Sequence, residues 1–149
     1  MYQKTDPPSF KQTLAAFLVL LLILMVPQGV IAQKSFPPPP VARTSITSSS
    51  TPTPVIILGG IQLYAVTTLG TIATFQDPTG LSSCLEGDQI QMEVRDNGTA
   101  RGLSFTSGYA AGSDVTMPTT TTAGKWLYML WACNATTHKM YLVGKADGF

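Results

Sequence analysis

Side chains suited to hydrolytic or metal chemistry are few in this 149-residue sequence, and they are scattered. His138 is the only histidine, and its polar surroundings suit a solvated loop better than a general base. A carboxylate pair would come from Glu86, Asp88 and Glu93. Asp88 and Glu93 lie five positions apart, which places them on opposite faces of one strand. Two cysteines and one histidine form no metal-ligand cluster. We therefore expect no enzyme, no metal site and no cofactor.

Aromatic side chains are the better candidates for a ligand site, because their rings can stack on flat apolar surfaces such as those of sugars. Tyr109 lies in the glycine-rich stretch 108–112, where we expect it to be exposed. Trp126 and Tyr128 lie in an apolar run that also contains Trp131. Core packing is the favoured interpretation of Trp126 and Trp131, and ligand binding is the alternative. The candidate ligand-binding residues are Tyr109, Trp126 and Tyr128.

The N-terminal segment has the three parts of a secretory signal peptide. Lysines precede thirteen unbroken apolar residues, 14–26, and the small residues Val30 and Ala32 form a cleavage site. The alternative is an uncleaved membrane anchor. A span of about 20 apolar residues is reached only by including residues 27–29, which contain proline and glycine. Residues 1–32 are thus predicted to be a signal peptide or anchor, and the protein to be secreted or membrane-anchored.

A segment rich in proline, serine and threonine follows over residues 33–54. Its four consecutive prolines, 37–40, favour polyproline II, and the hydroxyl-rich part has little to bury. We expect a spacer here and a folded domain over residues 55–149. That domain carries five basic and seven acidic side chains and no basic stripe, so nucleic-acid binding has no support. Low charge and abundant hydroxyl side chains are typical of extracellular or virion β-proteins.

The strand signals begin at residue 55 and are short. Residues 55–58, 61–69 and 71–75 favour strands, separated by a Gly59-Gly60 turn, and residues 77–80 favour another turn. Polar and apolar residues alternate over 89–95, which predicts a half-buried strand. Asn97-Gly98 is typical of a type I′ turn, so a return strand over 101–106 would complete a hairpin.

A second hairpin is predicted from residues 126–133 and 140–145, joined by the polar loop 134–139. The first of these strands is apolar on both faces, and a small sandwich leaves one face of each sheet wet. We therefore expect a homo-oligomer, trimer before dimer, with one face of Trp126–Trp131 in the contact. The alternative is that residues 55–75 cover that face within one chain. The fold class predicted is all-β, a small antiparallel β-sandwich of jelly-roll type.

Four residues invite covalent modification in an exported chain. Cys84 and Cys133 would close a loop of about 50 residues as a disulfide, and a buried thiol at Cys133 is the alternative. Asn97 and Asn134 each begin a glycosylation sequon, which has meaning only in a eukaryotic host. A plain turn role accounts equally well for Asn97.

The C-terminal part also carries an ordered set of short segments. They are Asp96-Asn97-Gly98-Thr99-Ala100-Arg101, Leu103-Ser104-Phe105, Val115-Thr116-Met117-Pro118-Thr119-Thr120-Thr121, Lys125-Trp126-Leu127-Tyr128, Asn134 and Lys139. In order and spacing they resemble the terminal β-domain of tailed-phage virion proteins such as tail-fibre and head-fibre proteins, over about residues 87–149. Members of that family commonly carry Trp-Asp where this chain has Met140-Tyr141.

That resemblance implies a structural or adsorption module, often trimeric, with no catalytic residues. Together with the export signal, it predicts a non-enzymatic virion structural or receptor-binding module. Its expected partners are other copies of itself, a surface glycan or virion proteins. The alternative function is a cell-surface adhesion or carbohydrate-binding protein of a host cell.

Overall fold

The computed structural model describes residues 38–148 and confirms that this part of the chain is built from strands. The predicted signal peptide or anchor, 1–32, lies outside the described residues. Among those residues the only helical element is a short 3₁₀ turn, Leu81–Ser83. The strands are β1 Val41–Ile46, β2 Ile61–Leu69, β3 Ala73–Phe75, β4 Gln89–Asp96, β5 Leu103–Phe105, β6 Tyr109–Ala111, β7 Trp126–Asn134 and β8 Lys139–Asp147.

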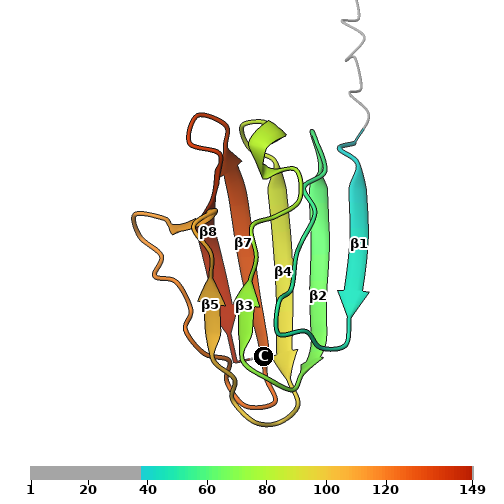
Figure 1. Ribbon diagram of the computed structural model, residues 1–149, viewed down its shortest axis with the longest axis vertical. Coiled ribbons are helices and arrows are strands. Elements are labelled where there is room, and N and C mark those ends of the chain that lie inside the picture. Colours follow the sequence, from blue (N-terminus) through green and yellow to red (C-terminus); the bar gives the residue numbers. More distant parts are fainter. Residues whose placement is uncertain (1–37, 149) are drawn as a thin grey trace, which may run out of the picture. The chain divides into compact units, whose positions relative to one another are not determined.

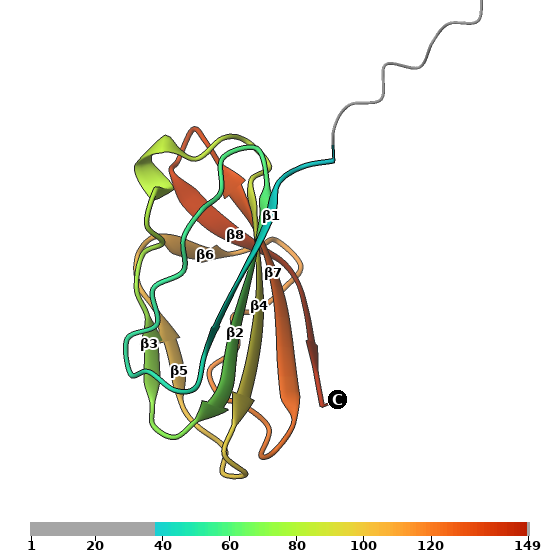
Figure 2. The same cartoon turned by 90° about the vertical axis from the view of Figure 1, so that its right-hand side faces the viewer.

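The strands form two layers (Figures 1 and 2). The large sheet has six strands in the order β1-β2-β4-β7-β8-β6, and the small sheet pairs β3 with β5. Residues 50–55 extend the small layer beside β3, because the carbonyls of Ser50, Pro52 and Pro54 accept hydrogen bonds from the backbone of residues 74–79 at 2.8–2.9 Å. Apolar side chains between the layers make the core.

The first half of the domain winds back and forth between these layers. The chain runs through β1, residues 50–55, β2, β3, β4 and β5 in turn. Among these strands, neighbours in the same layer lie parallel. The prediction of an antiparallel sandwich is therefore wrong for this half, although the two-layer all-β architecture holds. Strand direction depends on which distant segments pair, and the local sequence pattern carries no signal for it.

The predicted hairpin over residues 89–106 is also wrong. Strand β4 lies where its alternation placed it, but it pairs with β2 and β7, whereas β5 pairs with β3 in the other layer. A type I′ turn needs positive φ at both central residues. Gly98 has φ +94°, but Asn97 is not among the residues with positive φ. The segment after β4 crosses between layers instead of folding back.

Asp96 holds that crossing in place. Its carboxylate accepts hydrogen bonds from the Gly98 N–H at 2.9 Å, the Gly124 N–H at 2.7 Å and the Thr121 hydroxyl at 2.6 Å. Burial by itself would raise the pKa of Asp96. These hydrogen bonds and the charge of Arg101 outweigh burial and lower the pKa below the ordinary Asp value. A buried carboxylate thus links the end of β4 to the segment that enters β7.

The second predicted hairpin is confirmed. Strands β7 and β8 pair antiparallel, with Asn134 opposite Lys139 at the turn and a register shift between Leu130 and Trp131. His138 lies in this turn with φ +50°, exposed to solvent. Local apolar runs joined by a short polar loop favour this antiparallel pairing.

The boundary between spacer and domain lies earlier than predicted. Residues 41–46 form the edge strand β1, and Pro52 and Pro54 are buried residues of the small layer. The prediction of a spacer up to residue 54 is therefore wrong for residues 41–54, and residues 33–37 lie outside the described chain. Proline and serine composition hid the strand, because an exposed edge strand needs few apolar side chains.

Candidate binding face

Strand β7 has two different faces, as its sequence predicts. Leu127, Met129, Trp131 and Cys133 point between the layers and are buried. Trp126, Tyr128, Leu130 and Ala132 point away from the small layer and are half-buried. The small layer, which includes β3, lies over the inner face, where Phe105 packs against Trp131. No described segment covers the outer face (Figure 2). The outer face of β7 and its neighbours is therefore the candidate binding face.

Two aromatic rings lie on this face near the start of β7. The rings of Trp126 and Tyr128 lie 6.2 Å apart, centroid to centroid, with an angle of 32° between their planes. The Arg95 guanidinium carbon lies 5.8 Å from the centre of the Trp126 ring, and its Nε donates a 3.1 Å hydrogen bond to the Gly124 carbonyl. This arrangement holds the indole in place by a cation–π contact. The prediction of core packing is therefore wrong for Trp126, which is half-buried, and is confirmed for Trp131, which is fully buried.

Polar side chains of β4 border the aromatic pair. In the sheet register Glu93 lies opposite Tyr128, and Gln91 lies opposite Leu130. The Glu93 carboxylate also forms an ion pair with the Arg43 guanidinium of β1, with nitrogen and oxygen 3.5 Å apart, across the intervening strand β2. Amide, carboxylate and guanidinium groups therefore lie beside the half-buried rings on one face of the sheet.

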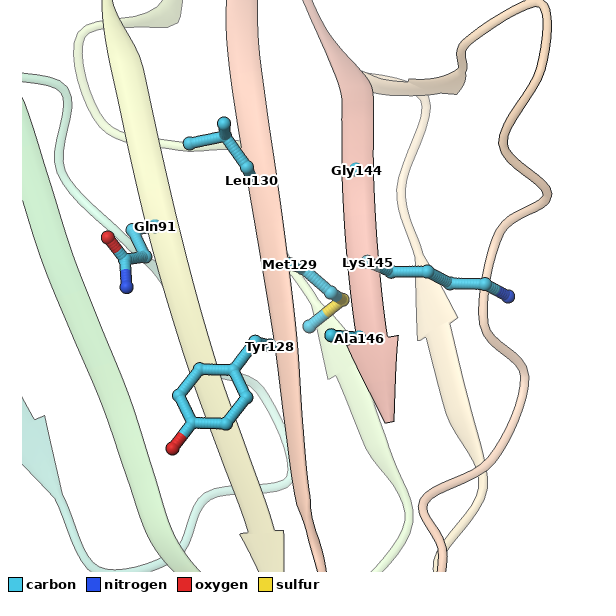
Figure 3. A pocket seen from close by; sticks show the side chains of 7 residues that line it. All are labelled: Gln91, Tyr128, Met129, Leu130, Gly144, Lys145 and Ala146. Carbon is cyan, nitrogen blue, oxygen red and sulfur yellow. The ribbon is translucent and has the colours of Figure 1, made fainter. Parts of the chain in front are cut away.

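An open hollow of about 310 Å³ lies between β7 and β8 on this face (Figure 3). It is lined by Gln91, Tyr128, Met129, Leu130, Gly144, Lys145 and Ala146. Gly144 lies opposite Leu130 in the register and has no side chain, so the surface is lower there. Lys145 points away toward the neighbouring loop, where its ammonium lies 3.4 Å from the Thr116 hydroxyl (Figure 3).

Sequence reasoning missed Gln91, Arg95 and the hollow at Gly144. A signal for the first two was present, because the outward positions of β4 follow from its alternation. The sequence did not indicate that β7 pairs with β4. That pairing brings the polar row of one strand beside the aromatic row of the other.

Tyr109 does not belong to this face, and the expectation that it is exposed is wrong. It begins β6, which pairs parallel with β8, and it is only 6% exposed. Its ring packs edge-on against Trp131, with centroids 4.9 Å apart. Burial, followed by the charges of Asp77 and Tyr64, raises the pKa of its hydroxyl well above the ordinary tyrosine value.

The scattered acids have structural partners. The Asp88 carboxylate accepts hydrogen bonds from the backbone of Gly59 at 2.7 Å and of Leu85 at 2.8 Å. Glu86 accepts one from the backbone of Ala135 at 2.9 Å. Within residues 38–148 no three histidine, cysteine or acidic side chains are grouped as metal ligands would be.

The modifiable residues lie as follows. Cys84 and Cys133 form a disulfide, with their Cα atoms 6.3 Å apart. Asn97 is exposed, and its side-chain oxygen accepts a 3.1 Å hydrogen bond from Arg101. The side-chain oxygen of Asn134 is occupied by the backbone of the two threonines that follow it by two and three positions.

Comparison with protein-family models, with curated proteins and with solved structures finds no match for this chain. No helix within the described residues is long and apolar enough to span a membrane, and the apolar run 14–26 lies outside them.

Proposed function

We propose that this chain is an exported, non-enzymatic receptor-binding module of the virion type, and that it binds through the outer face of its large sheet. The observation that carries the proposal is the pair Trp126 and Tyr128, held half-exposed on an open sheet face beside Gln91 and Glu93. Burial in the core would be the ordinary place for such large rings. Rings left at the surface beside polar groups are typical of binding sites.

The chemistry of this face suits a flat, hydroxyl-rich ligand such as a surface glycan. Aromatic planes offer stacking area, while the Gln91 amide and the Glu93 carboxylate offer hydrogen-bond partners for hydroxyls. Neither group belongs to a strong single-sign charge patch, because Glu93 is paired with Arg43. The face therefore offers no charged patch that would attract a highly charged polymer.

The export part of the proposal has independent support in the cysteines. The Cys84–Cys133 disulfide joins two segments 49 positions apart, and such bonds persist in oxidising compartments. The same observation favours a second candidate, a cell-surface adhesion or carbohydrate-binding protein of a host cell. Both candidates would use the same binding face, which would be displayed on a virion in the first and on a host cell in the second.

Mass spectrometry of purified virions separates the candidates. Detection of the chain as a stoichiometric virion component supports the virion role. Its absence from virions, together with binding of the exported protein to an immobilised glycan array, supports the cell-surface candidate.

The binding face itself is tested by substitution. Trp126→Ala and Tyr128→Ala should each weaken binding of the exported protein to receptor-bearing cells or glycans by about tenfold or more, as loss of a central aromatic contact does. Ile72→Ala is the matched control, because Ile72 is 67% exposed and lies next to the small layer. Wild-type binding by both aromatic variants would show that the outer face is not the site.

A further inference from the structure

The Asn97-Gly98 pair lies in the crossing between β4 and β5, with a charged group against each of its two residues. The Asn97 side-chain oxygen accepts a 3.1 Å hydrogen bond from the Arg101 guanidinium. The Gly98 N–H donates a 2.9 Å hydrogen bond to the Asp96 carboxylate. A cation thus contacts the side-chain carbonyl of Asn97, and an anion contacts the backbone amide that follows it.

An asparagine followed by a glycine is well suited to one internal reaction. The backbone nitrogen of the glycine attacks the side-chain carbonyl carbon of the asparagine and closes a cyclic imide, a succinimide. Glycine has no Cβ, so nothing on that residue crowds the attacking nitrogen. The reacting groups belong to adjacent residues, so no second molecule has to bring them together. The rate then depends on a base for the amide proton and on donors for the developing negative charge.

The two hydrogen bonds at this site match these two demands. As the Gly98 nitrogen bonds to the Asn97 side-chain carbon, its proton can pass to the Asp96 carboxylate, which lies within the reach of a general base. The Asn97 oxygen gains negative charge at the same time, and the Arg101 guanidinium already contacts it. An open hollow of about 380 Å³ is lined in part by Asp96, Asn97 and Gly98, so water reaches the site.

The Arg101 guanidinium also has a donor that an asparagine does not satisfy. Its Nε is buried and has no hydrogen-bond acceptor among the described residues. This Nε and the Nη2 that contacts Asn97 lie on one edge of the guanidinium. The Asn97 amide presents one oxygen, because its other terminal atom is itself a donor. A carboxylate at position 97 would present two oxygens, one for each of these donors.

We propose that Asn97 is a site of self-modification, at which the folded protein converts this asparagine to aspartate through a succinimide. In the first step the Gly98 nitrogen bonds to the Asn97 side-chain carbon, and the bond from that carbon to Nδ2 breaks. Nδ2 takes up the proton that Asp96 accepted and leaves as ammonia. In the second step water adds to the carbonyl that Arg101 contacts, the new bond to Gly98 breaks, and a proton of the water returns to the Gly98 nitrogen. The backbone is restored, and residue 97 carries a carboxylate paired with Arg101.

Asn134 is the internal comparison for this site, and we expect it to keep its amide. It precedes Ala135, whose Cβ crowds the attacking nitrogen. The Ala135 N–H donates to the Glu86 carboxylate at 2.9 Å, so a carboxylate on the following amide is common to both sites. The Asn134 oxygen accepts hydrogen bonds from the backbone of Thr136 and Thr137, which are neutral donors. The two sites therefore differ in the glycine and in the arginine.

Peptide mapping by mass spectrometry follows the conversion of amide to acid in the protein during incubation at neutral pH. We expect residue 97 to convert about tenfold faster in the folded protein than in a synthetic peptide of residues 92–103. Ring opening at the carbonyl that Arg101 contacts gives aspartate, whereas opening at the backbone carbonyl gives isoaspartate. The share of aspartate should therefore be higher in the folded protein than in the peptide, and fragmentation spectra distinguish the two products.

Arg101→Met removes the guanidinium but keeps the backbone hydrogen bonds between residue 101 and Thr121. It should slow the conversion about tenfold and raise the share of isoaspartate. Lys125→Met is the matched control, because it removes the same charge from an exposed side chain, and it should convert like the wild type. Circular dichroism and thermal midpoints check that both variants are folded. Asn97→Asp carries the product from the start, and the NMR signal of the Arg101 Nε–H should shift in it as this donor gains an acceptor.

Three results would overturn the proposal. The first is a folded protein that converts no faster than the peptide. The second is the same ratio of aspartate to isoaspartate in both, and the third is an Arg101→Met variant that converts as fast as Lys125→Met. An Nε–H signal that is unchanged in Asn97→Asp would contradict the pairing of the product with Arg101. None of these measurements involves ligand binding, so this proposal and the proposed function fail independently.

Discussion

The first half of the domain, residues 41–106, and the final hairpin, residues 126–147, contribute to one sheet in different ways. In the first half β1, β2 and β4 run parallel, and the chain passes through the small layer between each pair. In the hairpin, β7 and β8 run antiparallel and are joined by a short turn. Parallel neighbours need a long crossover, whereas antiparallel neighbours can be joined by a few residues. The wound half therefore depends on contacts far apart in sequence, and the hairpin on local ones.

A ring contact and a disulfide join the two halves. Trp131 on the hairpin packs against Phe105 of the wound half with ring centroids 5.2 Å apart. The disulfide also joins the two halves, and the Asp96 carboxylate binds the Gly124 N–H, two residues before the hairpin begins. Each of these contacts can be removed separately, which tests how far the halves depend on each other.

Trp131→Ala should have the largest effect. Emptying the space of a fully buried tryptophan costs about 3–5 kcal/mol in the free energy of unfolding. Trp126→Ala on the outer face of the same strand is the control, and we expect it to cost about 1 kcal/mol or less. Guanidinium denaturation of both variants measures the difference. Equal losses would mean that the two faces of β7 are not distinct as described.

Loss of the disulfide should come next. Cys84 lies in the wound half and Cys133 in the hairpin, 49 positions apart. In the chain-entropy model, closing a loop of that length stabilises the fold by about 4 kcal/mol. The Cys84→Ser/Cys133→Ser double variant should therefore unfold at a much lower denaturant concentration. Titration of two free thiols in the unreduced, unfolded wild type would contradict the bond.

Asp96 should make stability depend on pH at the acid end. Its pKa is lower in the folded state than in the unfolded state, so its contribution is present above the ordinary Asp pKa of about 3.9. It is lost as the pH falls from there through the folded pKa. The thermal midpoint of the wild type should fall over this window. Asp96→Asn should be less stable at pH 7 by about 1–3 kcal/mol and show a shallower acid dependence. Parallel pH profiles for both proteins would contradict this role.

Asn97→Ala should have the smallest effect and tests the connection after β4 directly. In a type I′ hairpin Asn97 would have positive φ, and alanine there would cost about 1–2 kcal/mol. In the crossing seen here Asn97 lacks positive φ, so the change in unfolding free energy should stay within about 0.5 kcal/mol. Gly98→Ala is the contrasting variant and should cost more, because Gly98 has φ +94°.

The sequence by itself determined several of the strands in both halves, among them 61–69, and which way their side chains point. The alternation over 89–95 placed Ile90, Met92 and Val94 in the core, and the apolar run 126–133 with its loop predicted the β7–β8 hairpin. These signals are local, because a strand repeats every two residues and a short polar loop favours pairing of the segments that it joins.

Only the tertiary structure decided which strands are neighbours. It placed β4 between β2 and β7, sent β5 to the other layer, and buried Tyr109 by pairing β6 with β8. It also made an edge strand of residues 41–46, whose composition predicts a spacer. The candidate binding face exists for the same reason, since the rings of β7 and the polar row of β4 meet only in the sheet. Pairing between distant strands is set by the combined burial and hydrogen bonding of the whole domain, and no short stretch of sequence contains that sum.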